Sequence, residues 1–171
     1  PLESGAISLS RAHYRVTYPA GFQLIAAMNP CPCGWLGSGK PCSCDPQKIA
    51  RYQQRVSGPI LDRIDLQVAV SPVNSSRLFE GGTHQEDLLS KLEDARAFRA
   101  QRLKAEKNDA LSSLSSAAKS RLVQSADALG LSARSVHKIA GVSRTLADLA
   151  TEHEVLVEQI DSALALRTAL G

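Results

Sequence analysis

Four cysteines lie close together in the pattern Cys31-Pro-Cys33 and Cys42-Ser-Cys44, with eight residues between the two pairs. Four thiolates brought together by a hairpin-like loop form the tetrahedral donor set that suits Zn²⁺. Such an ion would fold a loop that is too short to have a core of its own. Because all four ligand positions are taken, the site would be structural and not catalytic. The alternative interpretation is a set of buried or oxidisable thiols.

Two further residues could contact a phosphate. Arg63 precedes an alternating apolar segment, and its planar donor fork suits a phosphate on a neighbouring molecule. The alternative is a surface ion pair with Asp62 or Asp65, which would contribute only about 0–1 kcal/mol. Asn29 ends an apolar run, at the edge where parallel sheets place ligands, so its amide could orient a water or contact a phosphate. The alternative there is a simple Asn-Pro turn.

Two other motifs match known patterns superficially. Residues 34–40 satisfy G-x-x-x-x-G-K, but the next residue is Pro41 where a phosphate-binding loop needs Ser or Thr. The segment also lies between the cysteine pairs, so we interpret it as a coincidental match. Residues 130–149 resemble a helix-turn-helix in which a turn containing Gly141 joins two short helices. Many helical bundles share that pattern.

The elements that must position these residues change along the chain. All eight prolines and all four cysteines lie within the first 72 residues, and Ala, Leu, Ser and charged residues dominate afterwards. Residues 1–80 carry 8 basic and 5 acidic residues, whereas 81–171 carry 12 of each. We predict a mixed α/β part over 1–73, a linker over 74–83 and an all-helical part over 84–171.

Hydrophobic periodicity predicts the individual elements. Two short alternating segments are expected to pair as a hairpin, and two longer apolar segments are expected to be strands, the first of them buried and parallel. Ser132 is expected to cap the third helix of the second part and Thr151 the last. The predicted strands are 6–10, 14–18, 22–28 and 64–70, and the predicted helices are 47–56, 84–106, 112–129, 132–140, 143–150 and 153–168.

Length and composition exclude several classes of protein. The chain has 171 residues, a net charge of +3 and 43% hydrophobic residues, as in a globular protein. It has no apolar stretch of the roughly 20 residues that a membrane helix needs, and no signal peptide. Four cysteines without a secretion signal favour a reducing compartment, and we expect a cytoplasmic protein. Because the chain opens on Pro1 without methionine, we expect a piece of something longer.

The chain resembles the magnesium-chelatase-like AAA+ ATPases, and most of all their bacterial ComM/YifB branch. Three segments carry the resemblance in this order: residues 22–34, 57–66 and 131–149. The likeness runs from about residue 2 to residue 167. It implies the C-terminal part of an α/β P-loop core, with a hairpin and a Cys-rich loop, followed by a helical lid domain. The phosphate loop and acidic Mg²⁺ motif of the family would lie upstream, so most contacts to ATP and Mg²⁺ would come from there.

The resemblance also implies roles for single residues. Asn29 matches the sensor-1 position, which orients the water that attacks the γ-phosphate. Arg63 matches the arginine finger, which acts on ATP held by the neighbouring subunit. Arg134 fits the sensor-2 arginine of the lid best, with Arg144 as the second choice. Cysteines 31, 33, 42 and 44 match the Cys pairs of the family, and their binding of zinc is our chemical inference.

The family resemblance implies a ring-forming, hexameric ATPase that acts as a DNA motor of the branch-migration helicase type, in recombination or transformation. The hairpin would face the central pore, where His13 and Arg15 are candidate DNA contacts. The chain alone is not expected to hydrolyse ATP. Two alternatives remain: a stand-alone zinc-binding helix-turn-helix protein that binds DNA, and a chelatase-type ATPase subunit that remodels a protein partner.

Overall fold

The computed structural model describes residues 1–73, 85–105 and 109–167. Its contacts divide the chain into two compact units, Pro1–Ile64 and Asp65–Gly171. The sequence placed the end of the first part at residue 73, and the predicted linker 74–83 lies outside the described residues.

The first unit begins with the predicted hairpin, which is confirmed. Strand β1 (Ala6–Arg11) pairs antiparallel with β2 (Tyr14–Pro19), and the two form the only sheet among the described residues. Ser8 and Thr17 lie opposite each other and their hydroxyl oxygens are 3.0 Å apart. Because side chains alternate across a strand, every second cross-strand pair shares one face of the ribbon.

One face of this hairpin is exposed and is apolar except for Arg11, which lies opposite Tyr14 at the turn end. It is formed by the large side chains of both strands, and their exposed fractions range from 41% to 76%. The opposite face carries serine, threonine and arginine side chains. The hairpin is thus held by its own backbone ladder and presents its apolar face to solvent. The apolar face consists of Ile7, Leu9, Tyr14, Val16 and Tyr18.

Two helices end the first unit. Helix α1 (Pro46–Gln53) agrees with the prediction of 47–56 except that it begins one residue earlier and ends three residues earlier. Asp45 is its N-cap, and a carboxylate oxygen accepts the backbone N–H of Lys48 at 2.8 Å. Pro46 at the first helical position has no N–H to satisfy, so the sequence starts the helix there. A short helix not expected from the sequence, α2 (Gly58–Leu61), follows.

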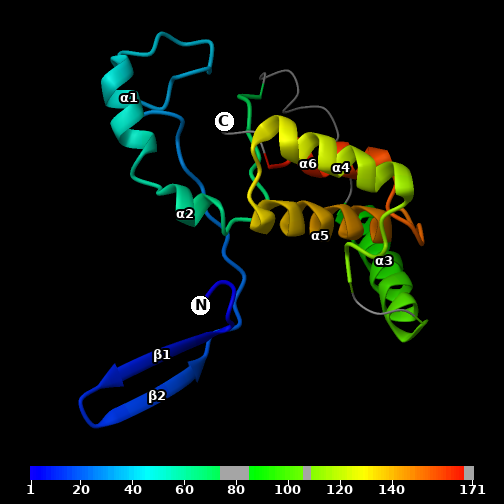
Figure 1. The fold of residues 1–171 in the computed structure, drawn as a ribbon. Coiled ribbons are helices and arrows are strands. Elements are labelled where there is room, and N and C mark those ends of the chain that lie inside the picture. Colours follow the sequence, from blue (N-terminus) through cyan, green and yellow to red (C-terminus); the bar gives the residue numbers. More distant parts are fainter. Residues whose placement is uncertain (74–84, 106–108, 168–171) are drawn as a thin grey trace. The chain divides into compact units, whose positions relative to one another are not determined.

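The second unit is helical, as predicted (Figure 1). It contains α3 (Gln85–Ala105), α4 (Ser116–Leu129), α5 (Ala133–Leu149) and α6 (Val157–Ala165). Helix α5 packs against α6 and α3, and α4 packs against α6. Gly130 ends α4 in the left-handed conformation, with φ of +61°, which a residue without Cβ adopts at no steric cost. None of the described helices is long and apolar enough to cross a membrane.

The core of this unit lies between α4, α5 and α6. Helix α5 presents one face to it because its buried residues recur at helical spacing, in pairs such as Ile139-Ala140 and Ser143-Arg144. Ser143 is fully buried, and its hydroxyl donates to the Ile139 carbonyl at 2.8 Å. The apolar core comprises Ala118, Leu122, Ile139, Ala140, Ala147, Val155, Ile160, Ala163 and Leu164.

Two predicted strands are wrong. Residues 22–28 and 64–70 have no strand structure. Their apolar side chains are exposed, up to 84% at Ile25 and 87% at Val70, except for the half-buried Ile64. A strand needs an adjacent strand to satisfy its backbone groups. No segment among the described residues pairs with either stretch, so neither forms a strand here. The α/β character of the first unit therefore rests on one hairpin and two helices.

Two local predictions in the second unit are also wrong. The helices expected at 132–140 and 143–150 are one continuous helix, α5, so no turn occurs at Gly141 and the helix-turn-helix interpretation fails there. The apolar spacing continues without a break through Gly141, which outweighs the helix-weakening effect of one glycine. Ser132 caps α5 as predicted, but Thr151 does not cap α6, which begins after Leu156.

A buried ion cluster joins α3 to α5. The guanidinium of Arg102 donates two parallel hydrogen bonds to the carboxylate of Asp148, at 2.9 and 3.0 Å. A second arginine, Arg144, lies 3.1 Å from the same carboxylate. The side chains of Arg102 and Asp148 are only 2% and 5% exposed. One carboxylate therefore forms ion pairs with two buried cations, so removing this carboxylate would lower the stability of the fold strongly.

We predict that Asp148→Ala lowers the free energy of unfolding by about 3–5 kcal/mol, because it leaves two buried guanidinium groups without their carboxylate. Urea denaturation followed by circular dichroism measures this. The control is Asp161→Ala, which removes the Arg121–Asp161 ion pair whose side chains are 46% and 48% exposed. That change should cost at most about 1 kcal/mol. Equal losses in the two variants would contradict the prediction.

Candidate metal centre and phosphate-contacting residues

The four cysteines form one cluster. The Sγ atom of Cys31 lies 3.3 Å from that of Cys33 and 3.7 Å from that of Cys42, and the Cys33 and Cys42 sulfurs are 3.5 Å apart. The sulfur of Cys44 completes the group, in which all four atoms lie within 4.8 Å of one another. All four are free thiols. A tetrahedral zinc–thiolate site has sulfurs about 3.8 Å apart, given a Zn–S distance of about 2.3 Å.

The turn after the first cysteine pair gathers the thiols. Cys31 is fully buried, and its carbonyl accepts the backbone N–H of Gly34 at 3.0 Å. Gly34 has φ of +81°, a left-handed conformation that a side chain would strain. Beyond this turn Lys40 lies over the ring of Trp35, 4.2 Å from its centroid. This stretch therefore forms the turns between the cysteine pairs, without the flanking strand and helix of a phosphate-binding loop.

The thiols differ in acidity. A backbone hydrogen bond from Trp35 lowers the pKa of Cys33 to about 6, against the raising effect of burial. A backbone hydrogen bond from Cys44 lowers the pKa of Cys42, but burial and hydrogen bonds with the Cys33 and Cys31 thiols outweigh it and raise that pKa to about 12. The pKa of Cys31 is lowered as well, against the raising effect of burial, by backbone hydrogen bonds from Leu36 and Gly34, whereas burial raises the pKa of Cys44. A metal ion must therefore displace protons at least from Cys42 and Cys44.

The donor set fits a closed structural metal site. Four soft sulfur ligands leave no open position for a substrate, and backbone N–H groups directed at the sulfurs provide the outer contacts that zinc–thiolate centres use. Within the described ranges this is the only group of three or more His, Cys, Asp or Glu side chains that could hold a metal ion. The centre would stabilise a stretch that buries only Cys31.

Asn29 lies beside the first turn of the cysteine loop. A Cβ placed on Gly34 would be 3.7 Å from Asn29 Nδ2, so the amide borders the first turn of the loop. The next residue, Pro30, accepts a hydrogen bond through its carbonyl from Gln53 Nε2 in α1, at 3.2 Å. Asn29 and Pro30 are thus held between the cysteine turn and α1. The position of the Asn29 amide depends on how the cysteine loop folds.

Arg63 follows α2 and is partly exposed. Its Nη1 donates to the carbonyl of Pro59 at 2.6 Å, and its Nε lies 3.7 Å from a carboxylate oxygen of Glu3. The side chain remains 37% exposed. Asp65, one of the two flanking carboxylates, forms an ion pair with Lys138. The Arg63 guanidinium is therefore oriented by α2 while part of it faces solvent.

The two candidate sensor-2 arginines have different surroundings. Arg134 is the second residue of α5 and is exposed. Arg144 is 4% exposed, and beside Asp148 it donates to the carbonyls of Glu152 and His153. The guanidinium of Arg144 thus takes part in the fold of the helical unit.

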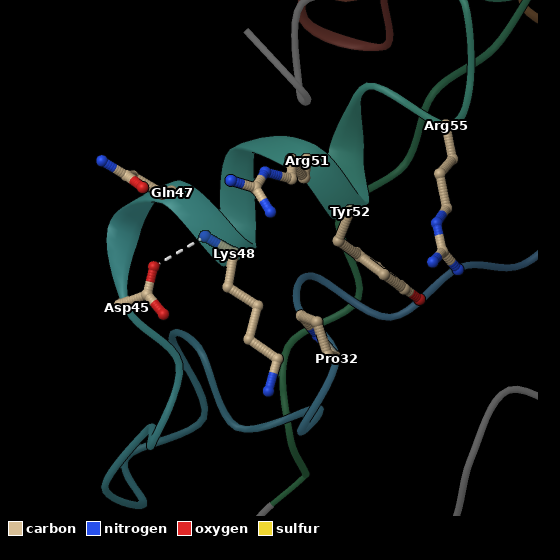
Figure 2. Close-up of a pocket in the computed structure, with 7 residues that line it drawn as sticks. All are labelled: Pro32, Asp45, Gln47, Lys48, Arg51, Tyr52 and Arg55. Atoms are coloured by element: carbon tan, nitrogen blue, oxygen red, sulfur yellow. Dashed lines mark hydrogen bonds between the residues drawn. The ribbon is translucent and has the colours of Figure 1, made fainter.

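Sequence reasoning missed a pocket of about 580 Å³ beside the metal centre (Figure 2). Three basic side chains and an aromatic ring from α1 and its C-terminal end line it together with Pro32, which lies between two of the cysteines. Figure 2 shows Lys48 and Tyr52 extending from α1 on the same side as Pro32. The basic residues of the lining are spaced three and four positions apart in the sequence, at Lys48, Arg51 and Arg55. This spacing is the sequence signal that could have indicated the pocket.

Two family models match the chain in succession. The model described as "Magnesium chelatase, subunit ChlI" matches residues 1–78, and the one described as "Magnesium chelatase, subunit ChlI C-terminal" matches residues 82–167. The second match alone covers half of the chain. The boundary between the two matches falls inside the segment 74–83.

Individual relatives show the same likeness. Competence protein ComM of Haemophilus influenzae is 37% identical over 98% of this chain and 35% of its own length. An uncharacterised protein of Mycobacterium tuberculosis is 34% identical over the same shares. YifB of Escherichia coli K12 is 51% identical over 41% of this chain and 14% of its own length. The chain spans about a third of the length of the relatives that it matches throughout.

We predict that the reduced protein binds one zinc ion per chain and that the ion protects all four thiols from alkylation. In the metal-free protein the alkylation rate of Cys33 should rise as the pH passes about 6 and then level off, because the thiolate reacts and its pKa is about 6. Cys42, with its pKa raised to about 12, should react much more slowly at neutral pH.

Elemental analysis and mass spectrometry of peptides after iodoacetamide treatment measure both effects. Cys33→Ser should abolish stoichiometric zinc, and Ser43→Ala, which changes a residue between two ligands without removing a thiol, should keep it. Protein purified under reducing conditions without bound metal that also fails to take up added zinc would contradict the site.

Proposed function

Because the chain belongs to the magnesium chelatase ChlI family, we propose that it is the C-terminal portion of a ring-forming AAA+ ATPase that acts as a DNA motor. The observation that carries the proposal is the match of residues 1–78 and 82–167, in this order, to the two parts of that family. The similarity to a competence protein over 98% of the chain supports a role on DNA. ATP and Mg²⁺ would be bound mainly by the part of the longer protein that precedes this chain.

The proposed roles follow from what phosphoryl transfer requires. That reaction depends on positioning and on neutralising charge more than on covalent chemistry. Asn29, held against the cysteine loop, would orient the attacking water through its neutral amide. Arg63 would direct its donor fork at the γ-phosphate on a neighbouring subunit, and its partial exposure supports this. Arg134, exposed at the start of α5, would contact the nucleotide from the lid.

An arginine finger supplied by a neighbouring subunit would make ATP hydrolysis depend on assembly of the ring. Each subunit would complete the ATP site of the next, so a hexameric ring would be active and an isolated chain inactive. Closure of the helical unit over the nucleotide would convert hydrolysis into domain rotation. The structure of α5 removes the stand-alone helix-turn-helix alternative as it was predicted, because no turn separates two short helices at Gly141.

Charge supports nucleic acid as the substrate of the motor. Residues 1–64 contain seven basic and three acidic residues, a net charge of +4, whereas the rest of the chain has a net charge of −1. The excess positive charge lies entirely in the first unit, where His13 and Arg15 are exposed at or beside the hairpin turn. We propose that this hairpin contacts DNA in the pore of the ring. We propose a cytoplasmic location, because four cysteines gathered to hold a metal ion must be kept reduced.

A second candidate function is remodelling of a protein partner by a chelatase-type ATPase. The family description, a magnesium chelatase subunit, favours it. The exposed apolar face of the hairpin would suit a protein better than a phosphate backbone. The two functions differ in which polymer stimulates ATP hydrolysis by the full-length protein. Stimulation by DNA supports the motor, and stimulation only by a protein partner supports the chelatase-type function.

We predict that Arg63→Ala in the full-length protein lowers ATP hydrolysis by about 10³-fold or more while ATP affinity stays within a few-fold of the original. An arginine finger stabilises charge that develops in the transition state, so its loss affects turnover and not ground-state binding. Steady-state hydrolysis and equilibrium binding of a fluorescent ATP analogue measure the two quantities. The control is Arg121→Ala, at an exposed ion pair on α4, which should change neither.

Mixed rings test action between subunits. Adding the Arg63→Ala protein to the original protein should lower total hydrolysis in proportion to the interfaces that lack an arginine. Hydrolysis that is unaffected by Arg63→Ala would remove this residue as the finger and leave the family assignment intact.

A further inference from the structure

The pocket between α1 and the cysteine loop has the chemistry of a site for single-stranded nucleic acid. Three cations line it, two from α1 and Arg55 from just beyond its end. The only carboxylate in the lining, Asp45, caps α1 by accepting the backbone N–H of Lys48. The pocket is therefore strongly positive and open to solvent.

Among the described residues, these cations have no acidic partner that would explain them. Within residues 1–73, 85–105 and 109–167, no carboxylate forms an ion pair with Lys48, Arg51 or Arg55. Like charges at spacings of three and four along a helix repel one another. An anion bound between them would relieve that repulsion. Arginine and lysine grouped in this way favour phosphate oxygens as the anion.

An aromatic ring lies among the cations. Tyr52 is partly buried and lines the same pocket as the three basic side chains. Sites for single strands combine a basic groove, which follows the backbone, with aromatic rings on which bases stack. A base in a duplex is already stacked and paired, so it gains nothing from such a ring. The pairing of Tyr52 with the cations therefore favours a single strand over a duplex.

The far wall of the pocket belongs to the metal centre. Pro32 lies between Cys31 and Cys33 in the chain and contributes to the lining. The volume of about 580 Å³ is in the range of pockets that hold a group the size of a nucleotide. The cysteine cluster thus places Pro32 opposite α1, in addition to stabilising its own loop.

We propose that this pocket binds the phosphodiester backbone of single-stranded DNA, with Lys48, Arg51 and Arg55 contacting phosphates and Tyr52 stacking on a base. The proposal rests on the proposed DNA motor function and names a contact surface within it. It is separate from the hairpin residues considered above, because it lies beside the cysteine loop and α1.

The test compares variants of the zinc-loaded full-length protein, bound to a fluorescent single-stranded oligonucleotide and to a duplex of the same sequence over a range of salt concentrations. The variant K48A/R51A/R55A should bind the single strand at least about tenfold more weakly, and its plot of log affinity against log salt should be shallower by about 2, as expected for three lost phosphate contacts at about 0.7 each. The control K91A/R96A/K119A removes three exposed cations from α3 and α4 and should leave the slope nearly unchanged.

Changes at Tyr52 test the stacking contact. Tyr52→Leu should weaken single-strand binding by about tenfold and affect the duplex much less, whereas Tyr52→Phe keeps the ring and should restore the affinity. Equal losses for single strand and duplex would overturn the preference for a single strand.

The outcomes separate this inference from the proposed function. If the protein binds DNA and K48A/R51A/R55A binds it equally well, the pocket is not the contact and the motor proposal stands. If neither protein binds DNA at any salt concentration, both proposals fail. Zinc content is measured in every variant. A triple variant that loses zinc would show that the cations stabilise the thiolates instead, which would also overturn the inference.

Discussion

The clustering of four thiols is the constraint on which the described part of the site depends. Between the hairpin and α1 the chain buries only Cys31, so this stretch has no apolar core to fix it. The sulfurs nevertheless lie within 4.8 Å of one another. The conformation of this loop determines three other features. It places the Asn29 amide beside Gly34, the Pro30 carbonyl within reach of Gln53, and Pro32 in the wall of the pocket.

The helical unit is stabilised by buried side chains and not by a cysteine cluster. It has an apolar core between α4, α5 and α6, and it fixes α3 to α5 by burying a carboxylate between two guanidinium groups. A buried charge of this kind adds directionality, because its hydrogen bonds form in only one arrangement. The helical unit is therefore held together by an apolar core and by a buried ion cluster, as the proposed lid would need in order to move as one body.

The sequence predicted features that depend on nearby residues. The hairpin, the Ser132 cap and the four-cysteine cluster follow from local periodicity, hydrogen-bonding side chains and close spacing. It mispredicted residues 22–28 and 64–70, because an apolar alternating segment has the composition of a strand whether or not another strand pairs with it. Arg102 and Asp148 are 46 residues apart in the sequence, so no local sequence pattern could predict their contact.

A single stretch from Asn29 to Arg55 therefore links several proposed activities. The amide assigned to sensing ATP borders the cysteine turn on one side, and the pocket assigned to DNA borders the same loop at Pro32. Because α1 is bonded to Pro30 and also carries two of the pocket cations, a displacement of the loop would move both sites together. In the proposed motor, such a displacement would couple the bound nucleotide to the contact with the DNA strand. A metal ion held by the four cysteines would stiffen this coreless loop, as transmission of a small displacement requires.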